Sequence, residues 1–139
     1  MRLRRRGAGL AALAWLAAMA FTGCAVPEPA PPAAPVGLAE LLERPGERAL
    51  FEGLRAYEDA QYASAEAALR RALAQGLQSP RDRAGAHKLL AFILCTSDRL
   101  AECEAAFRAA RAAHPGFALS RSEAGHPVWG PVYRRLQGP

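Results

Sequence analysis

Cysteine is the residue type best placed to do chemistry in this chain of 139 residues. Cys95 and Cys103 flank a predicted turn near residues 98–99 and lie about one helical turn from it, on opposite helices. In a tight helical hairpin, their Cα atoms can approach the range of a disulfide. The alternative is a pair of buried thiols that act as small apolar side chains. The sequence shows no partner group for a catalytic thiol beside either residue.

The histidines and the other polar residues indicate no metal or catalytic site. His87, His114 and His126 are scattered along the chain, without the close ligand spacing of a zinc site. No glycine-rich phosphate loop, carboxylate pair or Ser/His/Asp arrangement stands out. We therefore expect a protein that is not an enzyme and that uses no cofactor.

The third cysteine, Cys24, ends an N-terminal segment typical of exported proteins. Four arginines stand among the first six residues, and residues 8–21 are uncharged and mostly apolar. That run is too short to span a bilayer comfortably and is typical of a signal peptide. Residues 21–24, Phe-Thr-Gly-Cys, resemble the lipobox of bacterial lipoproteins, although Phe21 stands where leucine is commonest. The alternative is an ordinary secretory signal that is cleaved near Ala20 or Ala25.

The lipobox resemblance implies that Cys24 is acylated and becomes the N-terminus of the mature protein. Lipoproteins of this type carry more than one acyl chain, and two or more chains give stable anchoring. Aspartate after the cysteine retains Gram-negative lipoproteins at the inner membrane, so Ala25 implies the periplasmic leaflet of the outer membrane. The periplasm permits disulfides, which favours a bond between Cys95 and Cys103.

The formal net charge of +5 belongs largely to the signal peptide. Without its four arginines, 14 basic residues face 13 acidic ones, so no electrostatic footprint for nucleic acid remains. Residues 25–36 contain five prolines, which favour an extended polyproline II spacer. The chain is therefore divided into a signal peptide (1–23), an acylated cysteine with its spacer (24–36), a helical domain (37–119) and a C-terminal capping segment (120–139).

The helical domain is rich in alanine, leucine, arginine and glutamate, which are strong helix formers. No sustained alternation of β-branched residues is present, so strands are not expected. The predicted fold class is all-α. The predicted helices span residues 38–43, 47–59, 62–75, 83–96, 100–113 and 132–136.

The four long helices form two copies of one unit. Residues 65–73 align with residues 103–111 at an offset of 38, and small and large apolar residues recur at matching positions. The same offset aligns Leu54 with Phe92 and Tyr62 with Leu100, and such large residues are expected to fill the core. This is the pattern of a tetratricopeptide repeat, and the alternative is a generic alanine-rich helical bundle. Two repeats leave an apolar face open, so we expect caps from the first short helix and from the C-terminal segment.

The C-terminal segment contains the most distinctive stretch of the chain, residues 123–135. Pro127 and Pro131 restrict its backbone, and Pro131 suits the first turn of a final short helix. One interpretation is a lid that closes the second repeat. The other is a surface for docking a partner, because tryptophan, tyrosine and arginine are frequent interface anchors. The candidate residues for either role are His126, Trp129, Tyr133 and Arg134.

Together these features resemble the TssQ-type lipoproteins associated with type VI secretion. The resemblance rests on the lipobox, the proline-rich spacer, residues 86–93, the cysteine pair and residues 125–132. It implies an accessory envelope component of a contractile secretion apparatus, with envelope proteins as partners and no catalytic residues to transfer. The first competing hypothesis is a pilotin or assembly-factor lipoprotein for pili or outer-membrane proteins. The second, from a different class, is a periplasmic thiol enzyme or metal binder.

Overall fold

A computed structural model describes residues 37–138 of the chain. The predicted signal peptide, Cys24 and the proline-rich spacer lie outside the described residues. None of the described helices is both long enough and apolar enough to cross a membrane.

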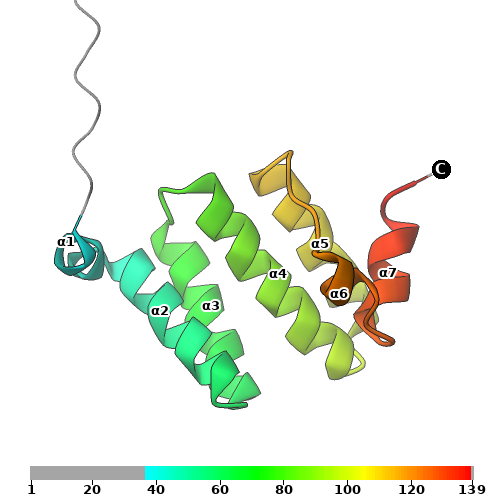
Figure 1. The fold of residues 1–139 in the computed structure, drawn as a ribbon. Coiled ribbons are helices and arrows are strands. Elements are labelled where there is room, and N and C mark those ends of the chain that lie inside the picture. The colour runs from blue at the N-terminus through cyan, green and yellow to red at the C-terminus, as the bar shows by residue number, and fades with distance from the viewer. Residues whose placement is uncertain (1–36, 139) are drawn as a thin grey trace, which may run out of the picture. The chain divides into compact units, whose positions relative to one another are not determined.

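The described part of the chain is all-α, as the sequence predicts, and it contains seven helices and no strand (Figure 1). Four long helices lie side by side, with one short helix before them and two after them. The elements are α1 (Leu38–Glu43), α2 (Pro45–Glu58), α3 (Tyr62–Gln75), α4 (Pro80–Thr96), α5 (Leu100–Ala113), α6 (Arg121–Ala124) and α7 (Trp129–Arg135).

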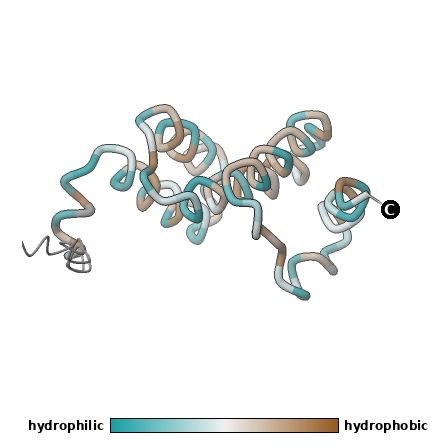
Figure 2. The backbone as a smooth tube through the Cα atoms, turned by 90° about the horizontal axis from the view of Figure 1, so that it is seen from above, coloured by the Kyte–Doolittle hydropathy of each residue, from teal (hydrophilic) through white to brown (hydrophobic). Residues whose placement is uncertain are grey.

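The helices pack mainly as sequential pairs. α2 packs along α3, α4 packs along α5, and α3 joins the two pairs through its contact with α4. At the start of the fold α1 contacts α2, and at the end α7 contacts both α4 and α5. Hydrophobic and hydrophilic residues alternate along the helices, as expected where one face of each helix is buried (Figure 2).

Three helices begin earlier than predicted, two of them at a proline. α2 begins at Pro45 rather than at residue 47, and α4 begins at Pro80 rather than at residue 83. Proline is tolerated in the first helical turn, because its missing N–H would have no helical partner there. Ser79 also caps α4 by accepting a hydrogen bond of 3.2 Å from the backbone N–H of Asp82.

The C-terminal segment is more helical than predicted. α6 was not predicted; it is held by a capping box, in which Ser120 and Glu123 each accept a hydrogen bond from the other's backbone N–H. The last helix begins at Trp129 rather than at residue 132, so that Pro131 still lies in its first turn.

The core is built from equivalent positions of the two helix pairs. The small and large apolar residues of α3 recur as completely buried residues of α5 at the predicted offset. Three of the four large aligned residues do not fill the core as predicted. Tyr62 and Leu100 are about half exposed at the starts of their helices, and Leu54 is 40% exposed, whereas Phe92 is buried. The fully buried equivalents are Ala65 and Cys103, Leu69 and Phe107, and Ala72 and Ala110.

Gly53 shows why a small residue is needed where α2 meets α3. A Cβ atom at this position would lie 2.9 Å from Cγ of Leu69, which is completely buried. The aligned residue of the second pair, Ala91, is also completely buried. The close approach of the paired helices therefore depends on residues with little or no side chain.

Candidate binding groove and the cap that closes the fold

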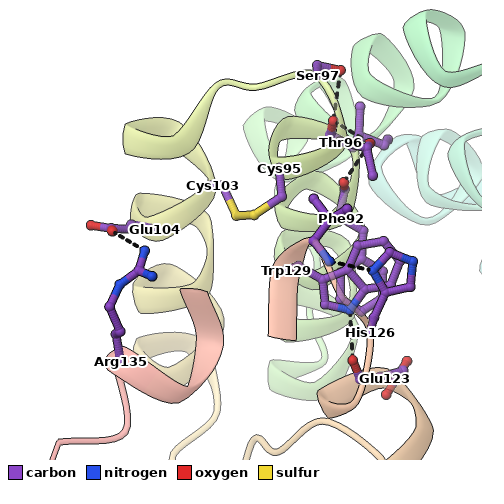
Figure 3. Close-up of a disulfide and its surroundings, with 12 residues drawn as sticks. Phe92, Cys95, Thr96, Ser97, Cys103, Glu104, Glu123, His126, Trp129 and Arg135 are labelled. Carbon is purple, nitrogen blue, oxygen red and sulfur yellow. Dashed lines mark hydrogen bonds and ion pairs between the residues drawn. A yellow bond between two sulfur atoms is a disulfide. The ribbon is translucent and has the colours of Figure 1, made fainter. Parts of the chain in front are cut away.

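The two cysteines of the described chain lie where α4 ends and α5 begins. Their sulfur atoms are at disulfide distance, and their Cα atoms are 5.2 Å apart (Figure 3). Both residues are buried, at 3% and 0% exposure. The geometry is that of a structural cross-link between two adjacent helices, and it leaves neither sulfur presented to solvent as a reactive thiol.

Trp129 joins the C-terminal segment to the core through ring stacking. Its indole lies on the ring of Phe92, with centroids 4.1 Å apart, and His126 stacks on Trp129 with centroids 3.3 Å apart (Figure 3). The indole N–H donates a hydrogen bond of 2.9 Å to the backbone carbonyl of Glu123. The ring is therefore packed against α4, and its polar atom is satisfied within the segment itself.

Tyr133 and Arg134 also contact the folded chain. The Tyr133 ring is buried beside Phe107, and its hydroxyl accepts a hydrogen bond of 3.2 Å from the backbone N–H of Leu119. Arg134 is exposed but donates a hydrogen bond of 2.9 Å to the carbonyl of Ala124. All four candidate residues of this segment thus make contacts within the fold, which favours the capping interpretation over the docking one.

An ion pair fastens the cap to α4. Lys88 Nζ lies 2.6 Å from a carboxylate oxygen of Glu123, and both side chains are 27% exposed. Burial alone raises the pKa of Glu123, but hydrogen bonds from Lys88 and from Ser120 outweigh burial, so that this pKa is lowered. The carboxylate therefore stays ionised against its lysine at neutral pH.

A second set of charges connects the two helix pairs. Arg99, just before α5, donates hydrogen bonds of 2.8 Å to Glu66 on α3 and 2.7 Å to Glu102 on α5. Arg70 on α3 also reaches Glu102, at 3.2 Å. The hydrogen bond from Arg99 is the main reason that the pKa of Glu102 is lowered. Except for Glu66, these groups are well exposed to solvent, so we regard them as fixing orientation more than adding stability.

A groove runs between α2 and α4 and continues to the loop after α5; we call it the α2–α4 groove. Its first part is a hollow of about 190 Å³ with the apolar residues Leu50, Leu54 and Leu89 in its lining. Its second part, of about 260 Å³, reaches His114 and Phe117. The two parts share Arg81, Gly85 and Lys88 in their linings, so they adjoin each other along α4.

Apolar side chains extend this groove along α2. Leu54 also lines an adjoining hollow of about 310 Å³ together with Phe51 and the charged residues Arg55, Glu58 and Asp59. Phe51 is 50% exposed and Leu54 is 40% exposed, so that both present apolar surface to solvent. A contiguous apolar surface beside a hollow is the usual mark of a binding site.

A separate hollow of about 390 Å³ lies between α3, α4 and α5. Leucines and alanines form most of its lining, and Arg70, Glu102 and His87 are its polar residues. Burial lowers the pKa of His87 below its ordinary value of 6.5, so the imidazole is neutral at pH 7. Across the described residues, no cluster of three or more His, Cys, Asp or Glu side chains is suited to hold a metal ion.

Comparisons of the chain with protein-family models, with curated protein sequences and with solved structures found no match. The candidate site is therefore supported by the geometry of the described residues alone.

The groove was not predicted from the sequence, whereas the C-terminal segment was singled out as either a cap or a docking surface. The C-terminal segment can be recognised in the sequence, because its aromatic residues and prolines lie close together in the chain. The groove is assembled from α2, α4 and a loop, and its members are ordinary residues of amphipathic helices. The one local signal was Gly85, a glycine within a stretch of strong helix formers.

Proposed function

We propose that this protein is a lipid-anchored adaptor of the bacterial envelope that binds a partner protein in the α2–α4 groove. In this proposal its two helix pairs are tetratricopeptide-like repeats, and it serves as an accessory component of a type VI secretion system. The observation that carries the adaptor role is the groove itself. A hollow flanked by exposed Phe51 and Leu54 lies on a helical scaffold whose other end is closed by its own cap.

The repeat assignment is supported by burial at equivalent positions. Three aligned pairs at the offset of 38 residues are completely buried in both halves, which a generic bundle does not require. Helical repeats bury their cores against neighbouring units and present extended binding surfaces. Helix-in-groove recognition is one of the common uses of such surfaces.

The anchor and the location are supported by the sequence alone. The basic start, the apolar run and Phe-Thr-Gly-Cys at residues 21–24 point to acylation of Cys24, and Ala25 points to the outer membrane. The five prolines that follow would separate the helical domain from the membrane surface. In this arrangement the groove is available to periplasmic or membrane-bound proteins within reach of the spacer.

The type VI assignment rests on the resemblance to TssQ-type lipoproteins. Two of the features that carry it, the cysteine pair and residues 125–132, both contact the second helix pair: the cysteines join α4 to α5, and Trp129 stacks on Phe92 of α4. The competing thiol enzyme is disfavoured by the position of Cys95 and Cys103, which are buried and face each other.

Site-specific photo-crosslinking in the producing bacterium tests this proposal. A photoreactive phenylalanine analogue replaces Phe51 at the edge of the groove, and crosslinked proteins are identified by mass spectrometry. We expect a type VI membrane, baseplate or sheath component, and we expect the Cys24→Ala variant to lose the crosslink. A secretin or barrel-assembly protein would instead support the pilotin alternative. Absence of any envelope protein, or a crosslink unaffected by Cys24→Ala, would contradict the proposal.

A further inference from the structure

Gly85 is the only glycine within the four long helices that no neighbouring residue explains in the described structure. A Cβ atom at Gly46 or Gly53 would collide with α3 or the residue that follows it, so these glycines permit close helix packing. A Cβ atom at Gly85 would meet nothing within 4 Å. Glycine inside a helix is less stable than alanine, so the fold alone gives no reason for it.

The position of Gly85 supplies a reason. It lies in the lining shared by the two parts of the α2–α4 groove, between the apolar part and the part that reaches the loop after α5. Glycine is the residue that allows another backbone or ligand to approach a chain closely. A side chain here would project into the open space of the groove and narrow it.

The charged residues of the groove indicate which kind of ligand it can bind. The part near the loop contains Arg81, Lys88 and His114 in its lining and no acidic residue. Lys88 is already paired with Glu123, whereas exposed Arg81 makes no ion pair with any other described residue. Asp82 belongs only to the apolar part. One arginine is thus left to bind an incoming carboxylate at that end.

We propose that the α2–α4 groove receives an acidic, amphipathic segment of the partner protein. The segment's backbone passes over Gly85, an apolar side chain rests on Leu54 and Leu89, and a carboxylate pairs with Arg81. This inference rests on the adaptor part of the proposed function. It adds the chemical class of the segment and the direction in which its apolar and acidic residues lie.

Two variants test the groove without weakening the fold. Gly85→Leu fills open space and replaces a glycine by a strong helix former, so its thermal midpoint should equal or exceed that of the wild type. Arg81→Glu reverses the groove charge and places an acid in the first turn of α4, where the helix dipole favours it. Arg108→Glu, on α5 and outside the groove lining, is the control charge reversal; it also breaks an exposed ion pair with Glu104.

The probe is a phage-displayed library of random dodecapeptides, selected on the full chain purified in detergent. We expect enrichment of peptides that combine aspartate or glutamate with leucine, isoleucine or phenylalanine. Their affinity should fall about tenfold or more for Gly85→Leu and for Arg81→Glu and stay unchanged for Arg108→Glu. Selection of no peptide, selection of peptides without acidic residues, unchanged affinity for either groove variant, or an equal loss with Arg108→Glu would overturn the proposal.

The two proposals can fail separately. If no acidic peptide binds while Phe51 still crosslinks to an envelope protein, the proposal of an acidic segment is wrong and the adaptor role stands. If acidic peptides bind as expected while the crosslink is absent from the envelope, the groove chemistry stands and the proposed location and partner are wrong.

Discussion

The two helix pairs of this protein have similar cores and different surroundings. Leu54 on α2 and Phe92 on α4 occupy equivalent positions at the offset of 38 residues. Phe92 is 4% exposed because Trp129 of the C-terminal segment stacks on it. Leu54 is 40% exposed and borders the α2–α4 groove. The same aligned position is thus closed by the chain itself in one helix pair and left open in the other.

This difference suggests that the two helix pairs have different tasks, one in stability and the other in binding. The second pair has a cysteine pair at disulfide distance, a stacked aromatic cluster and a cap fastened by Lys88 and Glu123. Among the described residues, the first pair is covered at its outer end only by the short helix α1. We infer that the second pair supplies most of the rigidity of the domain, and that the first pair supplies the surface left for a partner.

The largest expected effect comes from opening the cap. Trp129→Ala removes the ring that covers Phe92 and should lower the free energy of unfolding by about 3 kcal/mol. Urea unfolding followed by circular dichroism measures this loss. Val128→Ala is the neighbouring control, because Val128 is 42% exposed, and it should cost less than about 0.5 kcal/mol. Equal effects of the two substitutions would show that the segment does not cap the fold.

Removing the link between α4 and α5 should have the next largest effect. The double variant Cys95→Ala, Cys103→Ala should lower the free energy of unfolding by about 2–3 kcal/mol, on the entropic model for a short loop. Mass spectrometry after alkylation under denaturing, non-reducing conditions checks the bond directly. Both cysteines should remain unmodified until a reductant is added. Alkylation of either one in the unreduced protein would show that the bond is absent.

Two glycines distinguish a packed surface from an open one. Gly53→Ala should destabilise by about 1–2 kcal/mol, because its Cβ would press on the buried Leu69. Gly85→Ala should stabilise by about 0.5–1 kcal/mol, because nothing lies near its Cβ and alanine favours the helix. Thermal unfolding of the two variants and of the wild type shows whether each substitution raises or lowers the stability of the fold. Destabilisation by Gly85→Ala would mean that α4 is covered there by the fold.

The smallest expected effect is a pH dependence due to His87. Burial lowers the pKa of His87 in the folded protein, so the unfolded chain binds a proton more readily below its ordinary pKa of 6.5. Stability should therefore fall as the pH drops from about 7 towards 5. His87→Gln should remove this part of the slope, measured as the thermal midpoint at several pH values. Identical slopes for both proteins would refute the role of His87.

The sequence predicts the helices well where polar turns separate amphipathic stretches. α1, α3 and α5 match the predicted ranges at both ends. α2 and α4 begin at Pro45 and Pro80, two and three residues before the predicted starts, because proline at the first helical position is compatible with the helix. α6 was missed because a single capped turn has no hydrophobic period to detect.

The functional surfaces were less predictable from the sequence. The importance of the C-terminal segment, though not the choice between a cap and a docking surface, could be predicted because Trp129 and Tyr133 are large and close together in the chain. The groove could not, because which apolar residues stay uncovered depends on how α2, α4 and the loop after α5 are placed in space. Leu54 and Phe92 illustrate this, since the alignment treats them alike and only the tertiary contacts separate them.

Paired photo-crosslinking at one exposed position in each region tests the central claim most directly. Phe51 lies at the edge of the groove and Val128 lies in the cap, and the two are 50% and 42% exposed. With the same photoreactive residue at each position, we expect the envelope partner to be captured from position 51 and not from position 128. Capture of that partner from position 128 and not from position 51 would contradict the account, because the cap and not the groove would then be the binding surface.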